Sequence, residues 1–204
     1  DYMTASQEVV LGPGYNYWAM IKPLSKGDVS PRSFASHVVD CYMLTYAPIT
    51  QDYTESAFDL RQTESLITSI NELSGLIMHY IKFDKQNIIK KSLCLCAHKQ
   101  ICTHFDEPSF IDLNHFLENL KMHTSKIQVK DLENRDFYEE LCNIISITQY
   151  NIKQLIMKTV SGKNLSKASG LSIYFPTGRI DKSFQSTIFA KKTLWLEMLK
   201  QLKS

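Results

Sequence analysis

Apolar residues recur every three or four positions along much of the chain, a spacing typical of helices with one buried face. The clearest series is Leu66, Ile70, Leu73, Ile77 and Tyr80, whose members stand at i, i+4, i+7, i+11 and i+14. Similar series predict further helices at about 31–45, 85–98, 110–122, 131–158 and 195–202. The first of these would begin at Ser30-Pro31, a favourable helix start, and the whole pattern predicts a mainly helical chain.

Two segments have the pattern of strands instead. Residues 2–10 are enriched in Thr, Val and Tyr and stop at Gly12-Pro13-Gly14. Residues 170–175 are mostly apolar and stop at Pro176. The sequence therefore predicts one strand near each end of the chain, with helices between them.

The stretch that joins the first two long helices has no apolar period. Residues 46–54 hold Pro48 and small polar side chains, so a loop is predicted there. Ser56 and Asp59 have the spacing of a capping box, which would start the next helix at this point. Two isolated strands among six helices are then best explained as the edge of a larger parallel or mixed sheet, in an α/β fold. The remaining strands are expected upstream of Asp1, in a longer protein.

Composition and charge are those of an ordinary globular domain. Of the 204 residues, 44% are hydrophobic and 22% are charged, which allows a core of useful size. The 23 basic and 21 acidic residues give a formal charge of +2, without a long block of either sign. Neither nucleic acid nor an anionic membrane is therefore expected as a partner. No apolar run approaches the roughly 20 residues of a membrane-spanning helix, so no membrane segment is expected in this chain.

Five cysteines, an odd number, indicate no disulfide framework. Cys41 and Cys142 lie on apolar helical faces and are expected to be buried free thiols. Cys94, His98 and Cys102 would share one face of a helix, and thiolate and imidazole are ligands that zinc prefers. Structural zinc sites usually take their ligands from two separate segments, however. Incidental buried thiols in a helix are therefore the favoured interpretation, and a helical zinc-binding module is kept as an alternative.

Four stretches resemble, in order, the C-terminal part of the clostripain family of cysteine peptidases. The first, TASQEVVLGPGYNY, resembles the strand and loop that follow the family's catalytic residues, and SAFDLRQTESLITSINELSGLI resembles its Ser-x-x-Asp-Leu helix start. The third, IDLNHFLENL, resembles its Asp-Leu-x-x-Phe helix, and GLSIYFP with FAKKTLWLEMLKQL resembles its last strand and Trp-containing helix. The resemblance covers nearly the whole chain. It implies the C-terminal part of a caspase-like α/β fold with a predominantly helical extension.

The resemblance also implies how the chain is divided and where catalysis takes place. Residues 1–83 would form a caspase-like part with the substrate-pocket strand, residues 84–160 a helical extension, and residues 161–204 a C-terminal strand and helix. The family uses a His that precedes a Gly and a Cys in an Asp-x-Cys motif, both upstream of the Ala-Ser-x-Glu strand. This chain has neither motif, and Cys41, which follows Asp40 directly, does not fit the second. No catalytic residue is therefore assigned here, and both are expected on an N-terminal catalytic segment of the same protein.

The predicted substrate site is the strand that opens the chain. An extended peptide can pair with a strand edge, and alternate side chains then face the cleft. Ser6 and Glu8 would lie on the same side, where a carboxylate favours the guanidinium or ammonium group of Arg or Lys. The alternative is that Glu8 pairs with a helix Lys or caps a loop. The residues predicted to contact a peptide or protein substrate are Thr4, Ala5, Ser6, Gln7, Glu8 and Tyr17.

The assembled protein would be an endopeptidase that cleaves after Arg or Lys through a Cys thiolate, with this chain supplying pocket walls and scaffold. The alternative from another class is a catalytically inactive homologue that binds peptides or proteins. Tyr15 and Trp18 are further wall candidates, although core packing is the preferred interpretation of Trp18. Calcium is suggested by the resemblance alone, since no EF-hand-like acidic run occurs. A secreted or cell-envelope location is suggested in the same way.

Overall fold

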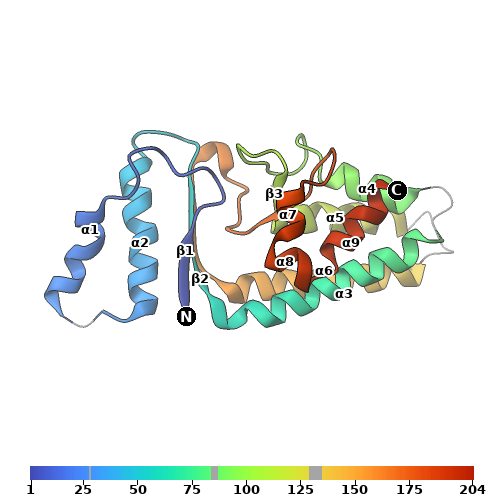
Figure 1. Ribbon diagram of the computed structural model, residues 1–204, viewed down its shortest axis with the longest axis horizontal. Coiled ribbons are helices and arrows are strands. Elements are labelled where there is room, and N and C mark those ends of the chain that lie inside the picture. The colour runs from blue at the N-terminus through green and yellow to red at the C-terminus, as the bar shows by residue number, and fades with distance from the viewer. Residues whose placement is uncertain (28, 84–86, 129–134) are drawn as a thin grey trace.

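The computed structural model describes residues 1–27, 29–83, 87–128 and 135–204, which form helices and two small sheets (Figure 1). The helices are α1 (Tyr17–Ile21), α2 (Pro31–Tyr46), α3 (Thr63–Ile81), α4 (Ile88–Cys96), α5 (Leu113–Gln128), α6 (Arg135–Leu155), α7 (Lys182–Ser186), α8 (Ile188–Lys192) and α9 (Trp195–Lys203). The strands are β1 (Tyr2–Ala5), β2 (Thr54–Asp59), β3 (Phe110–Asp112), β4 (Ile156–Ser161) and β5 (Ser172–Tyr174). Short 3₁₀ turns occur at Lys22–Lys26, Leu60–Gln62 and Lys163–Leu165.

A three-stranded sheet in the order β1-β2-β4, with both pairs antiparallel, separates α2 from the other long helices (Figure 1). Every residue of the central strand β2 is buried. Its side chains alternate between two environments, because Ala57 packs against Ala35 and Val39 of α2 while Phe58 joins the large core on the opposite face. β2 therefore has no side that faces solvent.

β1 is the outer strand of this sheet. The N–H of Leu60 donates to the carbonyl oxygen of Asp1 (3.0 Å), and Met3 lies opposite Phe58. Because hydrogen-bonded pairs alternate along antiparallel strands, the backbone N–H and C=O groups of Thr4 point away from β2. Among the described strands, none pairs with that side. β1 thus presents an open edge with unpaired backbone groups.

One large apolar core holds the helical part together. It is drawn from α3, α5, α6 and α9 together with β5, and α9 is fixed onto β5 by the indole N–H of Trp195, which donates to the carbonyl oxygen of Tyr174 (2.7 Å). The indole is completely buried, so this bond satisfies its one polar atom. Other large side chains at the centre of this core are Leu73, Ile77, Phe116, Leu117 and Ile145.

The second sheet is small and joins two distant segments. β3 and β5 pair antiparallel, with Ile111 opposite Ile173. Asp112 ends β3 and caps α5, since its side chain accepts a hydrogen bond from the N–H of His115 (2.8 Å). The chain therefore changes from strand to helix within one residue at this position.

The α/β fold class that the sequence predicts is confirmed, and the main helices lie where the apolar spacing places them. α2 starts at Pro31, and the Ser30 hydroxyl accepts from the N–H of Ser33 (3.2 Å) as a helix cap. α3 buries the predicted face, including Leu66 and Ile77. The predicted helices at 85–98 and 131–158 correspond to α4 and α6, although residues 85–86 and 131–134 lie outside the described residues.

The two predicted strands are shorter than expected and belong to different sheets. The predicted strand at 2–10 stops at Ala5, because the chain turns at the next residue. The predicted strand at 170–175 is reduced to β5, which pairs with β3 and not with β1. The expectation that both edge one sheet is therefore wrong for the described part of the chain.

Three strands are absent from the prediction. Residues 54–59 form β2, so the predicted loop end and the capping box at Ser56 and Asp59 are wrong, and α3 begins later, at Thr63. β2 is covered on both faces. Its sequence therefore lacks the alternation of polar and apolar residues that marks a strand with one exposed face. The predicted helix at 110–122 begins with β3, and the predicted helix at 131–158 ends in β4.

Candidate functional site

The segment that follows β1 turns onto the first residue of β2. The hydroxyl oxygen of Thr54, which is buried, accepts hydrogen bonds from the N–H groups of Gln7 (2.9 Å) and Glu8 (3.0 Å). The Ser6 hydroxyl lies 2.9 Å from the same oxygen and accepts from the N–H of Glu8 (3.1 Å). One threonine therefore fixes the path of three predicted site residues, and Ser6 and Glu8 do not alternate along a strand.

Gln7 points into the protein. Its Nε2 donates to Oδ2 of Asp112 (2.9 Å), and its Oε1 accepts from the N–H of Gly170 (2.9 Å). Both polar ends of the side chain are thus used within the fold. Gln7 ties the end of β1 to the loop before β5, and its side chain positions the segment.

Asp112 is completely buried and stands at the centre of this network. Besides the Gln7 amide, its carboxylate accepts from the N–H of His115 (2.8 Å) and from the N–H and hydroxyl of Ser169 (2.6 and 2.8 Å). Hydrogen bonds to a charged acceptor are stronger than those between neutral groups, so several donors can stabilise one buried carboxylate. Asp112 therefore connects β1, α5 and the loop before β5.

Glu8 is held by backbone groups. Its Oε1 accepts from the N–H of Val9 (2.7 Å), and both carboxylate oxygens lie 3.1 Å from the N–H of Asp106. The carboxylate thus caps the loop at Asp106, which is the alternative that the sequence leaves open for this residue. Glu8 stays partly exposed, so its charge remains within reach of a ligand.

Thr4 and Ala5 face opposite sides of the sheet. Thr4 lines a shallow hollow of about 300 Å³ together with Phe34 and Val38 of α2. Ala5 packs against the large core, which identifies its side chain as a packing residue. Of these two predicted site residues, only Thr4 has a side chain that lines an open surface.

The segment beyond the glycine turn exposes aromatic rings. α1 starts at Tyr17, which is 67% exposed, and Trp18 is 68% exposed. The Lys22 ammonium lies 4.6 Å from the centre of the Trp18 ring. Core packing of Trp18 is therefore wrong for this chain, because no residue of α1 is buried. Together with Ile21, the two rings form an exposed apolar surface.

Glu55 is a completely buried acid that the sequence analysis does not identify as a site residue. It lies on the α2 side of β2, where its Oε2 accepts from the Tyr15 hydroxyl (3.0 Å). Its Oε1 is buried without a hydrogen-bond partner. Burial raises the pKa of this carboxyl to about 7, and the Tyr15 hydrogen bond partly opposes that shift. Glu55 therefore changes its charge near neutral pH.

Three tyrosines hold the loop that carries Gly12-Pro13-Gly14. Tyr15 is bonded to Glu55, and its ring packs against Tyr42 of α2 with centroids 5.3 Å apart. Tyr46, one turn further along α2, donates from its hydroxyl to the carbonyl oxygen of Gly14. Gly14 has a φ of +70°, which favours glycine. The loop is thus fixed to α2 and β2 by buried aromatic side chains.

The described residues include one Cys–His contact, and it lacks the properties of a nucleophile. The Cys41 sulfur lies 3.2 Å from Nε2 of His37, one turn earlier on α2. Cys41 is buried, and that burial, with the charge of Asp40, raises the pKa of the thiol. A reactive cysteine needs a lowered pKa and access to solvent. Cys41 is therefore a buried free thiol, as predicted, and Cys142 is half-buried.

The cysteines and histidines between 94 and 104 are dispersed. α4 ends at Cys96, so Cys102 is not on the same helix as Cys94. Cys94 is exposed, whereas Cys102 is buried and its thiol has a pKa raised to about 12 by burial. The two ring nitrogens of His104 lie within hydrogen-bond distance of the backbone carbonyl oxygens of Pro108 and Ala97. Within the described ranges, no three His, Cys, Asp or Glu side chains are grouped so that they could hold a metal ion.

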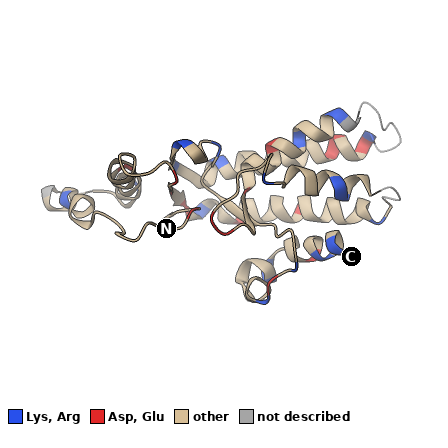
Figure 2. Cartoon of the chain, turned by 90° about the horizontal axis from the view of Figure 1, so that it is seen from above, with Lys and Arg blue, Asp and Glu red and all other residues tan. Residues whose placement is uncertain are grey.

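Basic and acidic residues are interspersed along the helices, as Figure 2 shows. None of the helices in the described ranges combines the length and the apolar character needed to span a bilayer.

Comparison with solved structures supports the same fold. An X-ray structure of an inactive zymogen of a C11 protease from Parabacteroides distasonis superimposes with a TM-score of 0.62 at 12% sequence identity. The match covers 95% of this chain and 51% of that protein, so the chain spans about half the length of this neighbour. No curated protein matched the chain.

Comparison with protein families gives the assignment. The model of the clostripain family matches residues 1–201, which is nearly the whole chain. The match includes the β1 segment, the Asp112 network and the C-terminal helix described above. This chain therefore belongs to the clostripain family of cysteine peptidases.

Proposed function

We propose that this chain is the C-terminal part of a cysteine endopeptidase that cleaves after Arg or Lys. The catalytic His and Cys would lie on an N-terminal catalytic segment of the same protein. Family membership supports peptide hydrolysis as the reaction, and the chain spans only half of its structural neighbour. Among the described residues, the thiols that lie in the core have raised pKa values, which is consistent with a nucleophile located elsewhere.

The observation that carries this proposal is the open edge of β1. Hollows flank that edge on both faces of the sheet. Met3 lines one of about 400 Å³ on the face away from α2, and Thr4 lines the one of about 300 Å³ on the face that packs against α2. An edge strand with unpaired backbone groups and apolar flanks is unfavourable unless another strand covers it. A strand of the catalytic segment would pair with this edge and place the reacting groups beside Ser6 to Glu8. The peptide substrate would then contact side chains of this segment, and not the backbone edge of β1.

A substitution at the open edge tests this docking. Thr4→Pro removes an N–H that points away from β2, so the chain itself should stay folded, because proline is tolerated on edge strands. Binding of the separately produced catalytic segment should weaken at least about tenfold, since a buried backbone acceptor would lose its donor. Thr4→Val, which keeps the N–H, is the matched control. Fluorescence anisotropy measures both affinities. Equal affinities of Thr4→Pro and Thr4→Val for the catalytic segment would contradict the proposed docking.

The cleavage preference is tested through Glu8. In the full protein, Glu8→Gln should lower the ratio of kcat/KM for cleavage after Arg to that after a neutral residue by about 10- to 100-fold, because one charge-assisted bond is lost. Glu107→Gln, on the neighbouring exposed loop, is the control. An unchanged ratio would remove Glu8 from the specificity site. Absence of all peptidase activity, with retained peptide binding, would favour the inactive homologue instead.

A further inference from the structure

A third hollow lies at the opposite end of the helical part from β1, between α4 and α9. It has a volume of about 620 Å³, within the range of small-molecule sites. Its lining comes from three segments: the end of α4, residues 175–179 after β5, and the last turns of α9. None of these lining residues belongs to the proposed substrate site, so this pocket is independent of the peptidase proposal.

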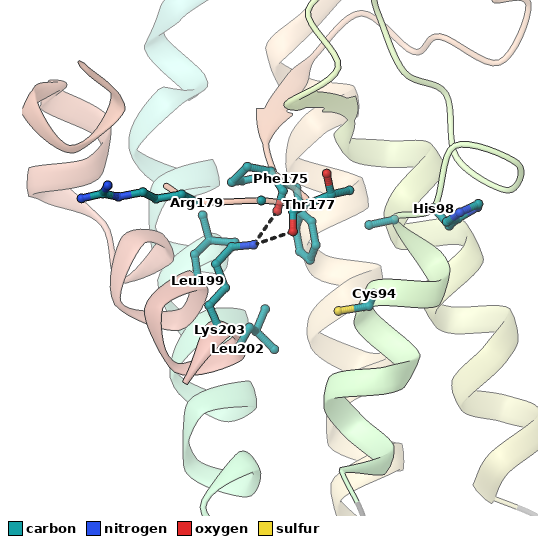
Figure 3. Close-up of a pocket in the computed structure, with 11 residues that line it drawn as sticks. Cys94, His98, Phe175, Thr177, Arg179, Leu199, Leu202 and Lys203 are labelled. Atoms are coloured by element: carbon teal, nitrogen blue, oxygen red, sulfur yellow. Dashed lines mark hydrogen bonds between the residues drawn. The ribbon is translucent and has the colours of Figure 1, made fainter. Parts of the chain in front are cut away.

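The floor of the pocket is apolar and closely packed against the core. Phe175 and Leu199 line it and are both buried in the large core. The Phe175 ring packs against Phe116 and Trp195, with centroids 5.4 and 6.2 Å away. Figure 3 shows the Leu202 side chain on α9 facing Cys94 on α4 across the hollow. An apolar group of a ligand would therefore meet a preformed surface.

The Lys and Arg side chains that line the pocket carry its charge, which is positive. The Lys203 ammonium donates to the carbonyl oxygens of Pro176 (2.8 Å) and Thr177 (3.3 Å), both of which line the pocket. These bonds hold the charge beside the opening and leave one of its three N–H donors unused. Arg179 adds a second positive charge to the lining, although Figure 3 shows its guanidinium pointing away from the hollow. No Asp or Glu belongs to the lining.

We propose that this pocket binds a small molecule in which an apolar group ends in a carboxylate. The apolar floor would take the hydrocarbon part, and the Lys203 ammonium would pair with the carboxylate. An ammonium already held in place loses little freedom on binding, so a single ion pair can contribute to affinity there. A fatty acid and a short apolar peptide with a free C-terminus share this chemistry.

Cys94 supplies a direct readout of occupancy. Its sulfur points into the hollow in Figure 3, and it is the exposed member of the five cysteines, three of which are buried. A ligand in the pocket would shield this thiol from alkylation. Peptide mapping by mass spectrometry separates Cys94 from the half-buried Cys142, which serves as an internal control.

The test uses the full protein with octanoate, octylammonium and N-acetylleucine as probes. Octanoate should slow iodoacetamide labelling of Cys94 at least threefold and leave Cys142 unchanged, whereas octylammonium should have no effect. Protection by N-acetylleucine as well would identify the peptide source, and protection by octanoate alone the fatty-acid source. Equal protection by octanoate and octylammonium would overturn the proposal, because the charge would then play no part.

Two substitutions complete the test. Lys203→Met keeps the apolar stem and should weaken octanoate binding at least tenfold in calorimetry, whereas Lys200→Met, on an exposed part of α9, should not. Cys94→Phe narrows the hollow without changing any charge and should weaken octanoate binding. Thermal denaturation without ligand shows whether each variant is folded. Unchanged octanoate affinity in Lys203→Met or in Cys94→Phe would overturn the proposal.

Discussion

Replacing Asp112 with Ala should lower the free energy of unfolding by about 3–5 kcal/mol. The change removes the cap of α5, which typically contributes about 1 kcal/mol. It also leaves the part-buried donors of Gln7 and Ser169 without an acceptor, each at a cost of about 1–2 kcal/mol, the lower part of the usual range. Urea denaturation followed by circular dichroism measures the loss.

Two further variants make the Asp112 result specific. Asp112→Asn keeps the shape but presents an NH₂ group to surrounding donors, so it should fall between the wild type and Asp112→Ala. Asp106→Ala, on an exposed loop, should change the stability by less than about 0.5 kcal/mol. A loss below about 1 kcal/mol for Asp112→Ala would show that water replaces the carboxylate and that the network does not hold Gln7 in place.

Glu55→Gln should change how stability depends on pH. The pKa of Glu55 is raised from 4.5 to about 7 in the folded chain. The contribution of Glu55 to the free energy of unfolding is therefore most favourable below pH 4.5. It declines between pH 4.5 and about 7, because in that interval the carboxyl is ionised in the unfolded chain and still protonated in the folded chain. At 1.36 kcal/mol per pKa unit, the decline attributable to Glu55 is about 3 kcal/mol.

Unfolding free energies of the wild type and Glu55→Gln, measured from pH 4 to pH 9, test this expectation. The difference between the two proteins should shift in favour of the variant between pH 4.5 and 7 and stay constant above that range. Tyr15→Phe removes the hydrogen bond that lowers the Glu55 pKa, so the decline should extend to higher pH in that variant. Parallel curves for the wild type and Glu55→Gln would refute the assigned pKa.

The sequence predicts those parts of the fold that have a local signature. α2 and α3 were predictable because each buries one face and therefore repeats apolar residues every three to four positions. β2 was not, because both of its faces are covered and its polar side chains find partners in other segments. Ser56, for example, lies 2.8 Å from the hydroxyl of Thr159 on β4. Strand pairing of this kind depends on tertiary contacts that local propensity does not encode.

The sequence predicted which segment forms the candidate site, but not the hydrogen bonds that hold this segment in place. The resemblance to the clostripain family places Thr4 to Glu8 beside a substrate, and that role stays a prediction. The inward turn of Gln7 depends on Asp112 and Gly170, which lie more than 100 positions away. The exposure of Trp18 was missed because large rings are usually buried, and whether a particular ring is covered depends on tertiary contacts.

The order β1-β2-β4 has a consequence for the synthesis of this protein. β2 receives its second neighbour from a strand whose residues are translated about 100 positions later, as the 103-residue separation of Ser56 and Thr159 indicates. Until β4 has left the ribosome, β2 lacks its second neighbour, and the backbone groups on that edge of β2 stay unpaired. Slow closure of such non-local pairs favours assistance by a chaperone during translation.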